Sequence, residues 1–181
     1  MSKYQPHYEY QPHYGWLRRE PAPKMLVTAQ ELLGVKESLG AVNNPIILGW
    51  AKECTIAYKE DSVPWCGLFM AVVAKRAGKP LPTQPLWARS WLRWGEPSPQ
   101  PELGDVLVFS RNGSGGHVGL YVGEDTAAFH VLGGNQGDAV SIVRINKDRL
   151  IGARRYYQFG APDNVRKVQL SMIGELSKNE V

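Results

Sequence analysis

The chain has 181 residues, 43% of them hydrophobic and 21% charged, and a formal net charge of +4 at pH 7. These values are typical of a globular protein of one domain with short tails, and they exclude a disordered, fibrous or disulfide-rich chain. No apolar run is long enough for a membrane span, and the first residues lack the apolar segment of a secretory signal.

The N-terminal segment contains a short tandem repeat, YQPHY at 4–8 and again at 10–14. Two copies are too few for a repeat fold, and proline with polar aromatic residues predicts an extended arm over 1–21. His7 and His13 could bind a metal ion, but a solvated arm explains them better. An arm that docks on a partner subunit is an intermediate interpretation.

The main domain is expected over 22–160, and its first part is helical. Asn44 followed by Pro45 predicts the N-cap and first position of a helix that ends near Cys54. Cys54 is interpreted as a small buried hydrophobe, because no basic motif flanks it. An earlier helix is expected from its apolar face, which carries Met25, Leu26, Ala29, Leu32 and Leu33.

A cysteine opens the third predicted helix. Cys66 follows an irregular segment with Pro64 and precedes apolar residues at helical spacing, Phe69, Met70, Val73 and Ala74. In the first turn of a helix, unpaired N–H groups and the helix dipole favour a thiolate, the nucleophile of cysteine hydrolases. The N–H of Cys66 would form part of an oxyanion hole, with Tyr58 as the candidate second donor.

Three tryptophans follow on one face of a short predicted helix, Trp87, Trp91 and Trp94. The stripe is expected to pack on the core. The alternative is an aromatic wall beside a cleft that holds a sugar or peptide, with Arg89 pairing with an acidic group.

After a proline-rich segment the pattern changes to strands. Apolar and β-branched runs predict five strands, at 104–109, 117–122, 127–132, 140–145 and 150–156. N-terminal helices packed on a roughly five-stranded antiparallel sheet define an α+β domain. The polar residues 161–181 are expected to form a C-terminal tail.

His117 begins the second of these strands and is the candidate general base for Cys66. Its imidazole needs an orienting group, and polar residues at the end of the third strand are the candidates. Asn135 could accept the ring N–H through its amide oxygen, and His130 could do the same in a suitable tautomer. Asp138 is a weaker option.

Four segments resemble the CHAP family (cysteine, histidine-dependent amidohydrolase/peptidase), most closely its phage and prophage branch, and the related NlpC-type peptidases. They are PWCGLF at 64–69, GDVLVF at 104–109, GHVGLY at 116–121 and VLGGNQ at 131–136. The resemblance covers roughly residues 22–156. It implies a papain-like fold and hydrolysis of a peptidoglycan amide bond, in the stem peptide, a cross-bridge or the muramoyl–alanine link. No metal or organic cofactor is expected.

The resemblance also implies roles for single residues. Cys66 carries over as nucleophile and His117 as general base. CHAP domains have an acidic residue and then an asparagine where this chain has Gly133 and Asn135, so Asn135 is the preferred third catalytic residue. NlpC-type enzymes use a histidine inside that strand, which keeps His130 as the alternative. Three further residues are candidates for substrate binding: Trp65, Trp87 and Arg89.

Delivery and alternatives follow from the same features. A protein made in the cytoplasm without a signal would reach the wall by release through a holin, as an endolysin, or on a phage tail, as a virion component. The mild positive charge suits an anionic wall polymer but gives no support for nucleic-acid binding.

The rival hypotheses are a non-catalytic virion or wall-binding protein on the same fold and a cytosolic amidase of small peptide conjugates. Alkylation of Cys66 at mildly acidic pH would separate a catalytic thiolate from a buried thiol.

Overall fold

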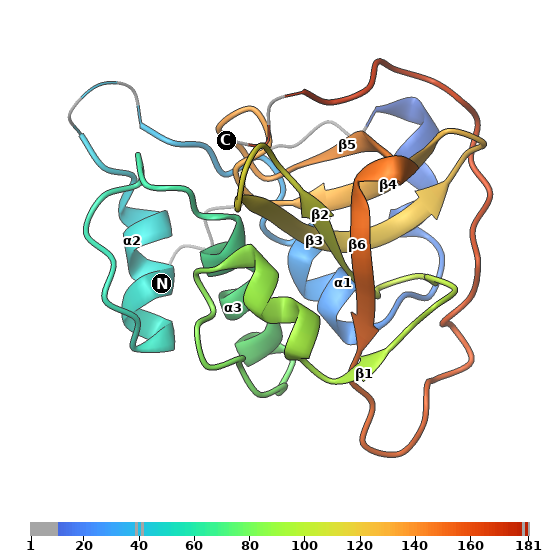
Figure 1. Ribbon diagram of the computed structural model, residues 1–181, viewed down its shortest axis with the longest axis horizontal. Helices are drawn as coiled ribbons and strands as arrows, with labels where there is room; N and C mark the ends of the chain where they lie inside the picture. The colour runs from blue at the N-terminus through green and yellow to red at the C-terminus, as the bar shows by residue number, and fades with distance from the viewer. Residues whose placement is uncertain (1–10, 39, 41, 179, 181) are drawn as a thin grey trace.

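The computed structural model, which describes residues 11–38, 40, 42–178 and 180, is built around a six-stranded antiparallel sheet (Figure 1). The strand order is β1-β6-β2-β3-β4-β5. This confirms the predicted α+β class with an antiparallel sheet, with one strand more than expected because the short β1 pairs with the end of β6. The strands are β1 Glu96–Pro97, β2 Val106–Ser110, β3 Gly116–Glu124, β4 Ala128–Gly133, β5 Ser141–Asn146 and β6 Leu150–Arg155.

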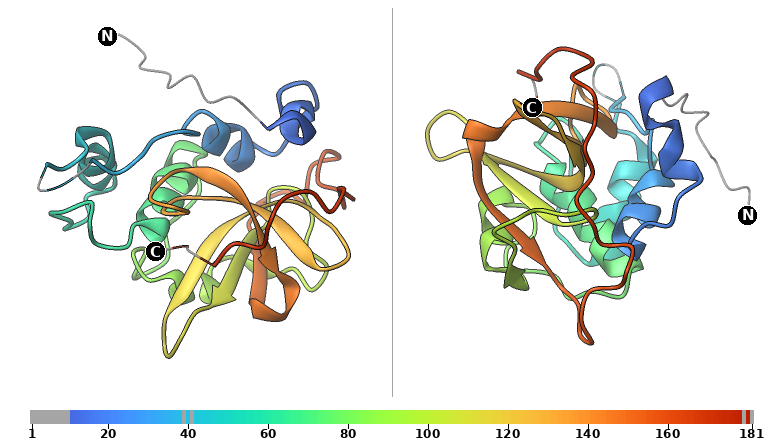
Figure 2. Two further views of the ribbon diagram at one scale, coloured as in Figure 1. Left: turned by 90° about the horizontal axis from the view of Figure 1, so that it is seen from above. Right: turned by 90° about the vertical axis from the view of Figure 1, so that its right-hand side faces the viewer.

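Helices cover one face of this sheet (Figure 2). Helix α3 contacts β3 and β4 and helix α1 contacts β4, while the 3-10 helix η2 packs on β2, β3 and β6. Helix α2 packs against α3. The helices are η1 Pro12–Arg18, α1 Lys24–Gln30, α2 Pro45–Cys54, α3 Cys66–Arg76, η2 Ala88–Arg93 and η3 Lys147–Arg149.

Helix α3 is buried on all sides. Every residue from Cys66 to Ala74 is buried, and a helix that is apolar all round has to be covered all round. Helices α1 and α2 and the sheet cover α3. The loop carrying Pro85 and Leu86 also lies close to its first turn, where a Cβ on Gly67 would come within 2.4 Å of both loop carbonyl oxygens. The start of α3 is therefore fixed between helix, loop and sheet.

Helix α2 begins and ends where the sequence predicts. The Asn44 side chain accepts a hydrogen bond of 2.8 Å from the N–H of Ile46, and Pro45 is the first helical residue. Thr55, in the left-handed conformation, closes the helix after Cys54. Cys54 is buried, as expected, and burial raises the pKa of its thiol.

The predicted extended arm over 1–21 is wrong for its second half. Pro12–Arg18 form η1, and Tyr14 and Leu17 are buried in the core. The physical reason is that the Tyr14 hydroxyl forms a hydrogen bond of 2.6 Å with His130, which satisfies the polar end of a buried ring. The first copy of the repeat lies outside the described residues.

The described part of the predicted C-terminal tail is mostly exposed, but it also makes specific contacts with the sheet. Gln169 pairs in parallel with Glu124, and Leu176 pairs with Arg144 of β5. Val168 packs on a second hydrophobic cluster, formed by the alternate side chains of the sheet that face away from the helices. The segment therefore covers part of the second face of the sheet, as the course of the red segment in Figure 2 shows.

The tryptophan stripe is confirmed as core packing for two residues only. Trp91 and Trp94 are buried, whereas Trp87 is 67% exposed. Since η2 is a 3-10 helix with three residues per turn, positions 91 and 94 fall on one side, and Trp87 precedes the helix.

Candidate functional site

Cys66 is the first residue of α3, and its sulfur lies against β3. Backbone groups of Val118, Gly67 and Cys66 itself hydrogen-bond to the sulfur. The expectation of a stabilised thiolate is nevertheless wrong for this structure. Burial raises the pKa of the Cys66 thiol, because the loss of water outweighs these hydrogen bonds and the nearby charge of Arg111. The neutral thiol is the favoured form.

His117 lies near the start of β3, where its ring contacts a residue that the sequence interpretation did not choose. Its Nε2 lies 2.9 Å from Oε1 of Gln136. The Gln136 amide nitrogen donates to the carbonyl oxygens of Ser141, at 2.6 Å, and Val131, at 3.2 Å. Carbonyls only accept, so these two bonds fix the amide with its oxygen toward the ring.

This orientation of the Gln136 amide fixes the tautomer of His117. An amide oxygen accepts a hydrogen bond, so Nε2 of His117 carries the proton and Nδ1 holds the lone pair. Nδ1 has no hydrogen-bond partner among the described residues. The thiol of Cys66 is therefore close to the strand but not hydrogen-bonded to the imidazole.

Burial also decides the charge of His117. It lowers the pKa of the imidazole to about 4, helped by the positive charges of Arg111 and Arg149 and opposed by the Gln136 hydrogen bond and the charge of Glu180. The ring is therefore neutral near pH 7. A neutral imidazole with a free Nδ1 is in the protonation state that a general base requires.

Two glycines at the end of β4 make this arrangement possible. A Cβ on Gly133 would lie 2.6 Å from Oε1 of Gln136 and 3.2 Å from Nε2 of His117. A Cβ on Gly134 would lie 2.5 Å from Cβ of Phe69 in α3. A side chain at position 133 would therefore displace the Gln136 amide from His117.

The structure pairs His117 with Gln136 and not with Asn135. Asn135 has a left-handed backbone (φ 59°) and is buried, and its Oδ1 has no hydrogen-bond partner among the described residues. Asp138, the weaker option, is exposed, whereas His117 is buried. The sequence did contain a sign of this role, because Gln136, the residue after Asn135, also carries a side-chain amide.

His130, the alternative third residue, belongs to another buried network. Its Nε2 donates to the carboxylate of Asp125 at 2.9 Å, so its Nδ1 accepts from the Tyr14 hydroxyl at 2.6 Å. Asp125 also accepts from Nε of Arg144 at 2.8 Å. Both ring nitrogens are occupied, and this network anchors η1 to the sheet.

Two other predicted roles do not fit the geometry. The Tyr58 hydroxyl donates to the carbonyl of Val63 at 2.6 Å, so its proton is not directed at an oxyanion. Trp65 is fully buried, and its indole N–H donates to the carboxylate of Glu37 at 2.6 Å. Trp65 is therefore a core residue and not part of a substrate-binding wall.

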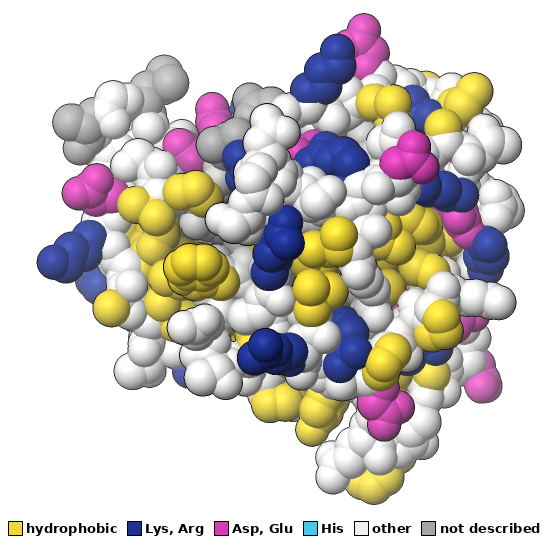
Figure 3. Space-filling model, viewed as in Figure 1, with side chains coloured by type: hydrophobic (Ala, Val, Ile, Leu, Met, Phe, Trp, Pro, Cys, Tyr) yellow, Lys and Arg dark blue, Asp and Glu magenta, His cyan; other side chains and the backbone are white. Residues whose placement is uncertain are grey.

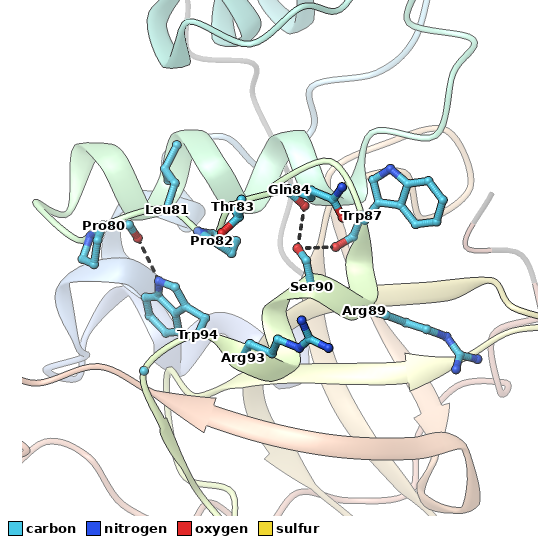
Figure 4. A pocket seen from close by; sticks show the side chains of 11 residues that line it. Pro80, Leu81, Pro82, Thr83, Gln84, Trp87, Arg89, Ser90, Arg93 and Trp94 are labelled. Atoms are coloured by element: carbon cyan, nitrogen blue, oxygen red, sulfur yellow. Dashed lines mark hydrogen bonds between the residues drawn. The ribbon is translucent and has the colours of Figure 1, made fainter.

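The other two candidate substrate residues, Trp87 and Arg89, line an open cavity of about 520 Å³. Figure 4 shows Trp87 at one end of it and Trp94 at the other. Nε of Arg89 donates to the carbonyl of Gly115 at 3.0 Å and so connects this cavity to the loop before His117.

A second cavity, of about 620 Å³, lies on the other side of that loop and is lined by the β2–β3 connection, Arg149 and the end of the chain. The two candidate catalytic side chains line neither cavity. Cys66 is 3% exposed and His117 is fully buried. The site is closed in this structure.

The described residues contain no group of His, Cys, Asp and Glu side chains arranged to hold a metal ion. In the same part of the chain, no helix has the length and apolar character needed to cross a membrane. Comparison with models of known protein families and with curated protein sequences gives no match. The function has to be argued from the site and from the sequence motifs.

Proposed function

We propose that this protein is a cysteine hydrolase that cleaves an amide bond of peptidoglycan. Cys66 is the nucleophile, His117 the general base and Gln136 the residue that orients His117. The observation that carries the proposal is the tautomer of His117, because an imidazole with Nε2 held by an amide oxygen and Nδ1 free is prepared to accept a thiol proton.

The reaction follows from these roles. His117 Nδ1 takes the proton of Cys66, and the sulfur forms a bond to the carbonyl carbon of the scissile amide. The C–N bond then breaks, the imidazolium returns the proton to the leaving amine, and a thioester remains on Cys66. Water, deprotonated by His117, attacks the thioester, releases the acid and restores the thiol. In this mechanism the backbone N–H of Cys66 stabilises the oxyanion.

The substrate class is inferred from the sequence motifs and from the surface charge. The four segments that resemble CHAP domains include both Cys66 and His117 and end with Gln136. A row of Lys and Arg side chains runs down the middle of one face (Figure 3), which suits an anionic polymer. A papain-like arrangement, with the nucleophile at a helix N-terminus and the base on an antiparallel sheet, is part of the same proposal.

A non-catalytic protein on this fold is the second candidate. The observation that favours it is the burial of Cys66 and His117, together with the absence of a hydrogen bond between them among the described residues. Catalytic hydrogen bonds are often long before substrate binds, so this geometry does not decide between the two.

The test is lysis of purified sacculi by wild type, Cys66→Ala and the matched control Cys54→Ala. We expect Cys66→Ala to lose at least about a thousandfold in rate with an unchanged circular dichroism spectrum, whereas Cys54→Ala stays active. Iodoacetamide should stop lysis and EDTA should not. Mass spectrometry of the released fragments identifies the bond cut. Lysis by Cys66→Ala at the wild-type rate would refute the mechanism, and no lysis by wild type would favour the non-catalytic candidate.

A further inference from the structure

Two arginines lie close to the start of β3. Arg149 donates to the carbonyl of Ser110, which pairs with Gly116 next to His117, and the Arg111 N–H donates to the carbonyl of Gly115 at 3.2 Å. The charge of Arg111 acts on both Cys66 and His117, and that of Arg149 acts on His117. Both arginines line the second cavity. The proposed reaction starts from a neutral thiol and a neutral imidazole, and it requires neither arginine.

The arginines hold a carboxylate of the chain itself. Nη1 and Nη2 of Arg149 donate to the two carboxylate oxygens of Glu180, at 3.1 and 2.8 Å, and Arg111 donates to the main-chain carbonyl of the same residue at 3.2 Å. Glu180 is only 2% exposed. Two parallel N–H···O bonds to one carboxylate are the geometry by which arginine recognises acidic ligands.

Arg149 is held in place independently of Glu180. Its Nε donates to the carbonyl of Ser110 at 3.2 Å, and the Ser110 hydroxyl donates to the Arg149 carbonyl at 3.2 Å. The guanidinium therefore keeps its outer edge directed at the cavity without help from the carboxylate. A preorganised donor pair of this kind is characteristic of a binding site.

The segment that carries Glu180 is held less firmly. Before it, Leu176 pairs with Arg144 in an isolated bridge, and the Ser177 N–H donates to the Arg144 carbonyl at 2.7 Å. The side chains of Met172 and Ile173 are largely exposed. The ion pair between Glu180 and Arg149 is thus one of the main contacts that hold the end of this segment.

The charge on Glu180 acts directly on the candidate base. It raises the pKa of His117, and the charge of His117 in turn lowers the pKa of Glu180. A carboxylate held by Arg149 therefore acts electrostatically on the candidate base.

We propose that Arg111 and Arg149 form a carboxylate-binding subsite of the candidate active site, which Glu180 occupies in the closed structure. Building on the proposed function, the ligand is a peptide with a free carboxylate close to the scissile amide. Such a peptide displaces Glu180, and the departure of the segment opens the way to Cys66. The subsite thus selects acidic peptides, and Glu180 acts as a built-in competitor.

The first test measures alkylation of Cys66 without any substrate. Rates with anionic iodoacetate and neutral iodoacetamide are compared by peptide mapping, which separates Cys66 from Cys54. In Glu180→Gln we expect faster alkylation by both reagents and an iodoacetate-to-iodoacetamide ratio about tenfold above wild type, because the arginines then accept the reagent carboxylate. Glu175→Gln, the same charge change at an exposed glutamate of the segment, should leave the ratio unchanged.

A second substitution identifies the arginine. Adding Arg149→Gln to Glu180→Gln should return the ratio to the wild-type value while iodoacetamide still reacts quickly. The proposal is overturned if Glu180→Gln and Glu175→Gln give the same ratio, or if Cys66 stays unreactive in every variant.

Hydrolysis of sacculi by the same variants keeps the two proposals separate. Lysis by wild type with no change in the alkylation ratio would refute the proposed subsite and support the proposed hydrolase activity. A changed alkylation ratio without lysis by any variant would support the proposed subsite and refute the proposed hydrolase activity. If both proposals hold, a model peptide with a free carboxylate should exceed its amidated form about tenfold in kcat/KM, and Arg149→Gln should abolish that preference.

Discussion

The tautomer of His117 depends on one neighbouring amide. Gln136 can present only its oxygen, because its nitrogen is bound to the carbonyls of Val131 and Ser141. A neutral amide orients the ring without adding charge, so burial keeps the pKa of His117 low. A carboxylate in the same place would orient the ring and raise the pKa as well.

Substitutions of Gln136 should therefore shift the pH profile in opposite directions. In Gln136→Leu the bond that raises the pKa of His117 is lost, so the acid limb of kcat/KM should move to lower pH, and kcat should fall about 10–100-fold because the ring is no longer oriented. In Gln136→Glu the acid limb should move to higher pH. The measurement is the pH dependence of sacculus lysis.

The control for these variants is Ser141→Ala. It removes a hydroxyl that donates to the main-chain carbonyl of Gln136 and accepts only a long contact of 3.5 Å from the amide nitrogen, while the bonds of that nitrogen to the carbonyls of Val131 and Ser141 remain. Its acid limb should coincide with that of wild type. Identical acid limbs in all three variants would mean that Gln136 has only a structural role.

Elements defined by local patterns were predictable from the sequence. The N-cap at Asn44 and the apolar run after Cys66 gave two helices, and the five main strands lie within a few residues of the predicted runs. Helix η1 was not predictable, because Tyr14 is buried through a contact with His130, 116 residues away. A repeat of tyrosine, glutamine and proline gives no local sign of that partner.

The docking of η1 can be tested through the same contact. Tyr14→Phe keeps the buried ring but leaves Nδ1 of His130 without its donor, so the free energy of unfolding should fall by about 1–2 kcal/mol. Tyr156→Phe is the matched control, because the Tyr156 hydroxyl has no hydrogen-bond partner among the described residues. Urea unfolding measures both. Equal stability of the two variants would show that the Tyr14–His130 bond does not hold η1.

At the scale of the whole molecule, the site combines segments that local patterns do not connect. The motifs were sufficient to select Cys66 and His117, since each opens a regular element. Gln136 lies beside His117 because the backbone turns at Asn135, which has a left-handed conformation. Glu180 lies beside Arg149 because of the path that the C-terminal segment takes across the sheet. These are properties of the folded chain, so the pairing of His117 with Gln136 in place of Asn135 could not be predicted from the motifs.

The burial that closes the site should also make the fold sensitive to acid. His117 has an ordinary pKa of 6.5 when unfolded and about 4 in the folded protein. Between these values the unfolded chain binds more protons, so stability is lost as the pH falls from 6.5 toward 4, by about 3 kcal/mol for this group. Urea unfolding at about pH 7 and about pH 4.5 should show a smaller loss in His117→Gln than in wild type, by about 2–3 kcal/mol. His13→Gln, at a half-buried ring whose pKa is also lowered by burial, should reduce the loss by less than His117→Gln does. An equal loss of stability in His117→Gln and wild type would mean that His117 is hydrated and that the site is open in solution.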